Sequence, residues 1–349
     1  MSLIKTYLAK LYAKNFLITL LGLELFFLLI DFLQNQKNIP SSANLIILYF
    51  YYQSFAALKV TLALSLVFGA LWSFLYLVKS NELTAIESVG VSKKEALKPF
   101  FMISLAVAVM YIMLGFTKVG YYYDDAQAIL QKKDSKERSE DLFFRYKDEF
   151  IYIKEIEPLS RSAKNIQIIG VDGNNVKYSI KAKEAVFEDD GWELKNAETM
   201  TINEQSEPHI VRKTEEKLKT LEGFKPKILD NISQSGEGLN IIDAIKALWL
   251  LKDQRLSLDK IKSALFSAIS LPLFAPFFIM ILGYHTPIAS RSFMQAKFAA
   301  FWIFSTLIGW GVLMALSKLS FYGSAGSYAT VFAIVGIGIY ARYLFRRLA

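Results

Sequence analysis

The chain has 349 residues, of which 53% are apolar or aromatic and only 21% are charged. A soluble chain carries about 25% charged residues, so we expect lipid to be part of the solvent of this protein. The sequence contains no Cys, which excludes disulfides, Cys-based metal or iron–sulfur sites and a thiol nucleophile. The net charge of +8 is compatible with nucleic acid, but its placement along the chain favours membrane orientation, and we expect no nucleic-acid partner.

Six apolar stretches are long enough to cross a bilayer as helices, which takes about 20 residues. They are 15–33, 60–78, 99–117, 263–283, 296–317 and 328–345. In the tract 45–78, Lys59 is predicted to separate an interfacial segment, 45–52, from the crossing segment. Pro99 is predicted to lie in the first turn of the third span, and Pro272 and Pro276 are predicted to bend the fourth.

Lys and Arg residues are concentrated in alternate short connections. If both termini are cytoplasmic, only Lys37 and Lys318 fall in outer short loops, and the remaining basic residues of the short connections lie inside. The positive-inside rule therefore predicts cytoplasmic termini and places the region between the third and fourth spans on the far side of the membrane.

That region, 118–262, alternates apolar and polar residues as strands do. Runs 172–175 (DGNN) and 189–191 (DDG) are typical of hairpin turns, and Trp192 is predicted to anchor a core. Residues 239–251 have helical spacing and are predicted to lie at the outer interface. The sequence thus predicts an α-helical membrane protein with a 3+3 arrangement of six spans, residues 1–117 and 263–349, around an inserted antiparallel β domain, residues 118–262.

The sequence lacks the residues that common catalytic sites need. It has neither a G-x-x-x-x-G-K-[ST] nor a G-x-G-x-x-G motif after a strand, so we expect no ATP hydrolysis by this chain. Its two His residues, His209 and His285, are far apart, and no H-E-x-x-H motif is present. We therefore predict a non-enzymatic protein with no catalytic residue, metal or cofactor.

The connection 79–98 (KSNELTAIESVGVSKKEALK) has the pattern of a short helix followed by a turn. Ser80 or Asn81 is predicted to cap the helix, and Glu82 lies in the first turn, where the helix dipole favours an acid. Gly90 is predicted to end the helix. The apolar residues at helical spacing are Leu83, Ile86 and Val89, and Ser92 is predicted to cap the next helix. An amphipathic connector and a docking helix for a cytoplasmic partner both fit this pattern.

Three runs in and after this connection, 81–83 (NEL), 88–92 (SVGVS) and 97–99 (LKP), resemble the YjgP/YjgQ permease family, the LptF and LptG subunits of the lipopolysaccharide exporter. The similarity covers the whole chain, including the 3+3 spans, the inserted β-rich region and the short basic loop at Arg291, and it is closer to LptG than to LptF. It implies a subunit of the bacterial inner membrane with a periplasmic jellyroll-like domain. It also implies a paralogous permease partner of the same layout, a cytoplasmic ABC ATPase dimer, and a periplasmic bridge of β-jellyroll proteins that receives lipopolysaccharide.

The resemblance implies that the ATPase grips a coupling helix at 80–92, around Glu82. The residues assigned to this coupling are Glu82, Leu83, Ile86, Glu87, Ser88 and Gly90. A phosphorylated glycolipid needs cations at the outer headgroup level, and four lysines fall near the outer ends of the first and third spans. These candidate substrate-binding residues are Lys37, Lys118, Lys132 and Lys133. Lysines that merely snorkel at helix ends would give the same pattern.

Three ionisable residues, Glu24, Asp31 and Lys59, lie in or at the edge of apolar spans. Because charge facing lipid is costly, we expect them to face a cavity, a partner subunit or the water interface. Glu24 either accepts a hydrogen bond that fixes helix packing or is functional. Two other functions stay open: an envelope scaffold or signalling protein whose β domain binds partners, and a secondary transporter driven by protons through Glu24.

Overall fold

The computed structural model describes residues 2–40, 42–130, 139–146, 149–157, 161–172, 175–188, 191–203, 209–221, 240–250, 258–288 and 294–348. The chain divides into two compact units. A helical unit comprises Met1–Ala126 and Ser263–Ala349, and a second unit, which contains the sheet, comprises Gln127–Lys262. Residues 118–126, which the sequence assigns to the insert, belong to the helical unit by this division.

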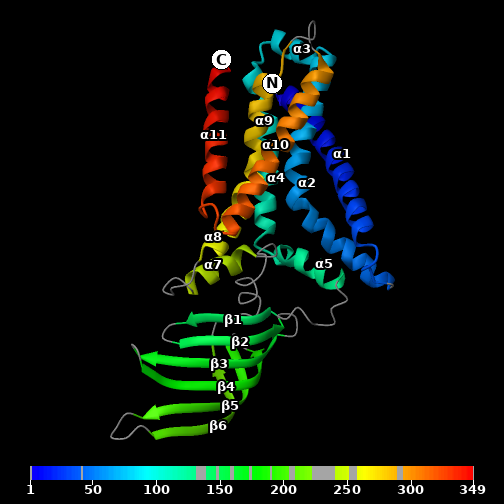
Figure 1. Cartoon of the computed structure of the whole chain (residues 1–349). Coiled ribbons are helices and arrows are strands. Elements are labelled where there is room, and N and C mark those ends of the chain that lie inside the picture. The colour runs from blue at the N-terminus through cyan, green and yellow to red at the C-terminus, as the bar shows by residue number, and fades with distance from the viewer. Residues whose placement is uncertain are drawn as a thin grey trace. The chain divides into compact units, whose positions relative to one another are not determined.

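The described residues include six helical segments that are long and apolar enough to cross a membrane, as the sequence predicts. They are α1 (Ser2–Asn35), α2 (Ala43–Lys79), α4 (Lys93–Leu114), α8 (Asp259–Ser270) continued through η2 (Leu271–Leu273) into α9 (Phe274–His285), α10 (Gln295–Phe321) and α11 (Ala329–Arg347). The short helices of this part are α3 (Glu82–Ser88), η1 (Lys118–Tyr121) and α5 (Tyr122–Leu130). Within the helical unit, α3 lies at the end where both chain termini lie (Figure 1).

The second tract forms one continuous helix, α2, of 37 residues, which includes the segment 45–52 and carries Lys59 as an exposed side chain. At about 55 Å this helix is longer than a bilayer core of about 30 Å, so the interfacial position of 45–52 stays a prediction. One predicted boundary is wrong. Pro99 does not open the third span, because α4 begins at Lys93 and Pro99 lies inside it. Side-chain capping rather than hydropathy sets this start, since the Ser92 hydroxyl accepts a hydrogen bond from the Glu95 backbone N–H. The predicted bend in the fourth span is confirmed, since the 3₁₀ turn η2 separates α8 from α9 there.

Helix α2 forms the centre of the helical unit and α1 lies at its periphery. In the most apolar 18-residue window of each helix, 78% of α2 is buried but only 6% of α1. The two helices nevertheless approach closely, because a Cβ atom added at Gly69 of α2 would lie 2.7 Å from the Cα atom of Phe16 of α1. Only glycine leaves room for the α1 backbone at this point.

The second unit contains an antiparallel sheet in which every strand pairs with its neighbours in sequence (Figure 1). Its strands are β1 (Ser139–Tyr146), β2 (Glu149–Glu157), β3 (Ser162–Asp172), β4 (Asn175–Glu188), β5 (Gly191–Asn203) and β6 (His209–Thr220). The inserted antiparallel sheet and both predicted hairpins are confirmed, since Asp172 pairs with Asn175 and Glu188 with Gly191. Trp192 is fully buried, as predicted for a core anchor.

The three central strands change phase along one row that crosses the sheet. On β4 the buried residues alternate on either side of a three-residue step from Ala182 to Ala185, and β3 and β5 each have the same kind of step. Asn165 of β3 and Asn196 of β5 sit in these steps and have positive φ angles of 52° and 50°. The strand registers place both beside Lys183 of β4. Asn tolerates this conformation better than most residues, and such irregularities bend strands while keeping the apolar side chains on one face.

The predicted helix before the fourth span is confirmed as α7 (Ile241–Leu250). The side chains of Ile241, Ala244 and Ala247 on one face of this helix are buried. Those of Ile242, Ile245 and Trp249 are exposed, at the i, i+3, i+7 spacing of an apolar helix face.

Candidate functional site

The candidate coupling site is the helix α3, between α2 and α4. The side chains of Leu83 and Ile86 are 6% and 8% exposed, which confirms two of the three apolar positions predicted to form one face. The third, Val89, is 73% exposed, so the prediction is wrong there. The Val89 N–H still donates to the Ala85 carbonyl at 3.3 Å, but Val89 lies six positions after Leu83 and therefore points about 120° away around the helix.

Gly90 ends α3 in the way the sequence predicts. Its φ angle is +84°, and its N–H donates to the Glu87 carbonyl at 2.9 Å. The next N–H, of Val91, donates to the Ile86 carbonyl at 3.3 Å, which completes a Schellman motif. The side chain of Val91, which follows Gly90, is buried, so the chain returns to the bundle directly after this turn.

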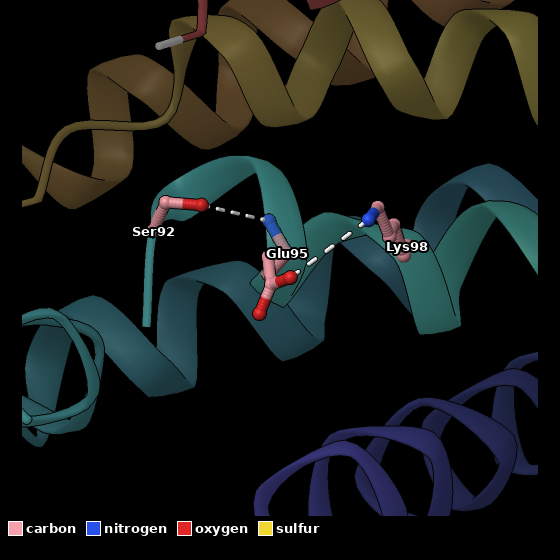
Figure 2. Close-up of polar contacts among 3 residues, drawn as sticks. All are labelled: Ser92, Glu95 and Lys98. Atoms are coloured by element: carbon pink, nitrogen blue, oxygen red, sulfur yellow. Dashed lines mark hydrogen bonds and ion pairs between the residues drawn. The ribbon is translucent and has the colours of Figure 1, made fainter. Parts of the chain in front are cut away.

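The start of α4 is fixed by side chains just after this turn. Figure 2 shows the Ser92 hydroxyl accepting from the Glu95 N–H, as predicted for a cap, and the Glu95 carboxylate 3.9 Å from the Lys98 ammonium. The first contact satisfies a helix N–H that has no partner within the helix. Both ends of the α3–α4 connection are therefore defined by local hydrogen bonds.

Hydrogen bonds also tie α3 to segments far away in the sequence. The Tyr7 hydroxyl of α1 donates to Oε2 of Glu82 at 2.6 Å, and the Thr84 hydroxyl donates to the Ile288 carbonyl at 2.9 Å. Next to them, the Lys93 ammonium donates to the carbonyls of Tyr284 and Thr286, at 2.7 Å and 2.5 Å. The coupling segment is thus linked to the first span and to the end of α9.

The remaining side chains of α3 are open to a partner. Ala85, Glu87 and Ser88 are exposed, and together with Val89 and Gly90 they form a surface next to the carboxylate of Glu82. The buried Leu83 and Ile86 hold the helix on the bundle. All six residues assigned to coupling therefore lie in one compact structure, and their role in binding an ATPase stays a prediction.

Of the four candidate substrate lysines, Lys37 follows the end of α1 and Lys118 begins η1, and both are exposed. Lys132 and Lys133 lie outside the described residues. Exposure leaves the ammonium groups of Lys37 and Lys118 available to a phosphate, but snorkelling gives the same picture.

Asp31 and Glu24 both contact α2, and whether either acid also faces a cavity or a partner subunit stays a prediction. Asp31 is 9% exposed and accepts hydrogen bonds from the Tyr49 hydroxyl, from Gln53 at 2.9 Å and from Asn35 at 3.1 Å. Glu24 accepts from the Thr61 hydroxyl at 2.5 Å. The physical reason is that polar side chains on α2 offer donors where lipid offers none, so both acids fix the packing of α1 on α2.

Several of these residues carry no signal in the sequence. Tyr7, Tyr49, Gln53 and Thr84 resemble ordinary helix residues, and their partners lie between 18 and 204 positions away. A polar residue placed inside an apolar run, such as Gln53, was the one available hint. No cluster of metal-ligating side chains occurs among the residues with described coordinates, so the fold offers no metal centre there.

The described residues thus have the features of a multi-pass membrane protein: six apolar helices, an inserted sheet, and a short helix between two spans. The family of lipopolysaccharide export system permeases LptF/LptG matches residues 6–347, and the chain belongs to this family. The match does not distinguish LptF from LptG. No curated protein matches the chain. The protein is accordingly a non-catalytic permease subunit of the inner membrane with a transport role in the lipopolysaccharide export complex.

Proposed function

We propose that this subunit extracts lipopolysaccharide from the outer leaflet of the inner membrane and passes it to a periplasmic bridge of β domains. A separate cytoplasmic ATPase dimer, docked on α3, supplies the energy, and a paralogous permease subunit completes the transport path. The observation that carries the proposal is α3 itself, a short helix held on the bundle by Leu83 and Ile86, with Glu82 at its start and an exposed surface beside it.

The number of crossings supports this division of work. Helix α3 connects the second and third spans, and the insert connects the third and fourth. If each of the six spans crosses the bilayer once, these two connections lie on opposite sides of it. The excess of Lys and Arg in the connections on the side of α3 makes that side cytoplasmic and the side of the sheet periplasmic. Energy would then enter at α3 and cargo would leave at the sheet.

The placement of acids and lysines along the first span agrees with this orientation. Tyr7 and Asp31 are 24 residues apart on α1, about 36 Å along a helix, which slightly exceeds the hydrocarbon thickness of about 30 Å. With α3 on the cytoplasmic side, this spacing would put Asp31 near the outer interface and Lys37, which follows the end of α1, beyond it. A cation at that level suits a phosphorylated glycolipid.

Docking is tested by replacing Glu82 in the full chain, co-expressed with the second permease and with the Walker-motif ATPase of the same organism's lipopolysaccharide export system. Glu82→Ala and Glu82→Lys should abolish co-purification of the ATPase and its stimulation, since a carboxylate facing a cationic partner is lost or reversed. The matched control is Glu95→Gln, because this nearby carboxylate is engaged with Lys98. Unchanged assembly of the Glu82 variants would reject the docking role.

Transport is tested by depleting the chain in its own host. The proposal requires lipopolysaccharide to accumulate in the inner membrane, whereas a scaffold or signalling protein would leave its distribution unchanged. A proton-driven mechanism through Glu24 predicts that Glu24→Gln changes the pH dependence of transport. Transport by this variant with the wild-type pH dependence would exclude that mechanism.

Headgroup binding by the lysines is tested by photo-crosslinking of lipopolysaccharide. Charge reversal of Lys37 together with Lys118 or Lys132 should lower crosslinking more than any single change. Lys5→Glu is the control, since it alters the same charge near the other end of α1. Equal crosslinking in all variants would favour snorkelling over binding.

A further inference from the structure

We propose that Tyr7 is the positioning residue that transmits the movement of α3 to α1. The inference rests on the proposed function, since it presupposes an ATPase that moves α3. It assigns a role to a residue of the first span that touches neither ATPase nor cargo. The geometry that carries it is the hydrogen bond from the Tyr7 hydroxyl to Oε2 of Glu82, at 2.6 Å.

The carboxylate of Glu82 has room for two partners. Tyr7 uses Oε2, and a carboxylate has acceptor sites on both oxygens, so Oε1 can still accept from a cationic donor on the ATPase. Tyr7 itself lies on α1 and its ring is 42% exposed, so its position is not forced by burial. The same acid can therefore be held from the ATPase side and from the α1 side at once.

For α3 to move relative to α2, the short connection between them has to act as the pivot. The two helices are separated by Ser80 and Asn81, and Asn81 adopts the left-handed conformation with φ 58°. Its side chain makes no capping bond to α3. A pivot at Asn81 would leave α2 in place, and the Tyr7–Glu82 bond spans this pivot.

Most of the other described polar contacts of α1 with neighbouring helices go to α2, although Tyr12 also contacts Ser104 of α4. The Tyr12 hydroxyl donates to the Leu66 carbonyl at 3.2 Å, and the Asn15 amide donates to the Ser73 hydroxyl at 2.9 Å. Glu24 and Asp31 also accept from α2 side chains. Among the described hydrogen bonds of α1, the one from Tyr7 therefore reaches past α2 to the coupling helix.

The test is Tyr7→Phe in the assembled complex in proteoliposomes, with ATP hydrolysis and lipopolysaccharide release to the periplasmic bridge protein measured together. We expect ATPase co-purification and hydrolysis at wild-type levels, because Glu82 keeps its charge. Transport per ATP should fall about tenfold, the size of a typical coupling between sites. The matched control is Tyr12→Phe, which removes a tyrosine hydroxyl from the same helix without touching α3.

A distance measurement gives a second readout, and the Cys-free chain suits it because two introduced Cys residues can be spin-labelled alone. Labels at Leu3 of α1 and Trp72 of α2, both exposed, report movement of α1 against α2. The distance between them should change between the ATP-bound and nucleotide-free states in the wild-type background. With Tyr7→Phe it should stay constant.

Each outcome separates this inference from the proposed function. Normal transport and a normal distance change in Tyr7→Phe would overturn the role of Tyr7 and leave docking at Glu82 standing. Loss of ATPase binding in Tyr7→Phe would overturn it too, because Tyr7 would then belong to the docking surface. An equal loss of transport in Tyr12→Phe would assign the effect to general packing of α1. If Glu82→Ala still binds and stimulates the ATPase, the proposed function itself fails.

Discussion

Asp31 is the residue whose replacement we expect to weaken the helical unit most clearly. It accepts hydrogen bonds from three side chains, of which the Tyr49 ring is fully buried and Gln53 is 4% exposed. In Asp31→Ala both buried donors lose their acceptor, whereas the third donor, Asn35, is only half-buried. The bonds from the two buried donors join α1 to α2 near the end of α1 remote from α3, where the rings of Phe32 and Phe50 also pack with centroids 6.1 Å apart.

The size of the effect follows from two bounds. A buried donor left without a partner costs about 1–3 kcal/mol, so two such donors give about 2–6 kcal/mol. Hydrogen bonds between membrane helices contribute only about 0.6 kcal/mol each on average, which gives about 1 kcal/mol for the two bonds that join α1 to α2. We therefore expect Asp31→Ala to lower the free energy of unfolding by about 1–4 kcal/mol. Asp31→Asn should lose less, since the amide keeps one oxygen acceptor.

The assay is reversible unfolding of the purified chain in mixed micelles, combined with a double-mutant cycle between Asp31→Asn and Tyr49→Phe. If the two side chains interact as the structure indicates, the double variant should lose less than the sum of the single losses. Additive losses, or an Asp31→Ala variant as stable as the wild type, would refute the assignment of Asp31 as a packing residue.

Three further predictions concern packing and the sheet. Gly69→Ala should lower the stability of the helical unit by about 1–3 kcal/mol, because the added Cβ would meet the α1 backbone. Gly22→Ala, whose Cβ would have nothing within 4 Å, should be neutral in the same unfolding assay. Trp192→Ala should destabilise the sheet by about 3–5 kcal/mol in fluorescence-detected unfolding, and equal loss in the exposed control Trp249→Ala would contradict this. Burial and the Glu149 carboxylate raise the pKa of Tyr178 to about 12, so the protonated hydroxyl stabilises the folded sheet fully below pH 10, and this stabilisation is lost as the pH rises to 12. The stability of Tyr178→Phe should therefore depend less on pH over this range. Identical pH profiles of stability in the two proteins would contradict the assignment.

The arrangement of spans was predictable because crossing a bilayer demands a long apolar run, and such runs are visible in any sequence. Their ends were not. Hydropathy placed the start of the third span at Pro99, but the hydrogen bond between Ser92 and Glu95 begins α4 at Lys93. Lys59 does not interrupt α2, because a single exposed lysine costs a long helix little when its ammonium can reach water.

The strands were predictable for a similar reason, since alternation has a short period and needs no distant partner. The bend was not predicted, because Asn165 and Asn196 look like ordinary polar positions of a strand. Their left-handed conformation shifts the alternation by one residue in each strand. At such a residue the alternation of buried and exposed side chains changes face, which the sequence of a single strand does not reveal. Only the pairing of neighbouring strands shows that the shifts lie side by side.

Helix α3 contains both features that were predictable from the sequence and features that were not. Spacing predicted Leu83, Ile86 and Gly90, because a helix and its glycine stop are local structures. The prediction for Val89 was wrong because a position six residues after Leu83 points about 120° away around the helix, although the glycine stop at Gly90 was correctly expected. Tyr7 could not be found at all, since its bond to Glu82 joins residues 75 positions apart.

The polar contacts of α1 matter more for its packing because this helix is expected to lie in lipid. Lipid is as apolar as the exposed leucines of α1, so the hydrophobic effect does not hold a peripheral span against the bundle, and close packing and hydrogen bonds must do so. Such contacts recur along α1 at Tyr7, Tyr12, Asn15, Glu24 and Asp31. Four of them fix α1 to α2, and the first fixes it to the coupling helix. Contacts at four points along α1 therefore resist its separation from α2, and a displacement applied at Tyr7 is expected to act first on the end of α1 next to α3.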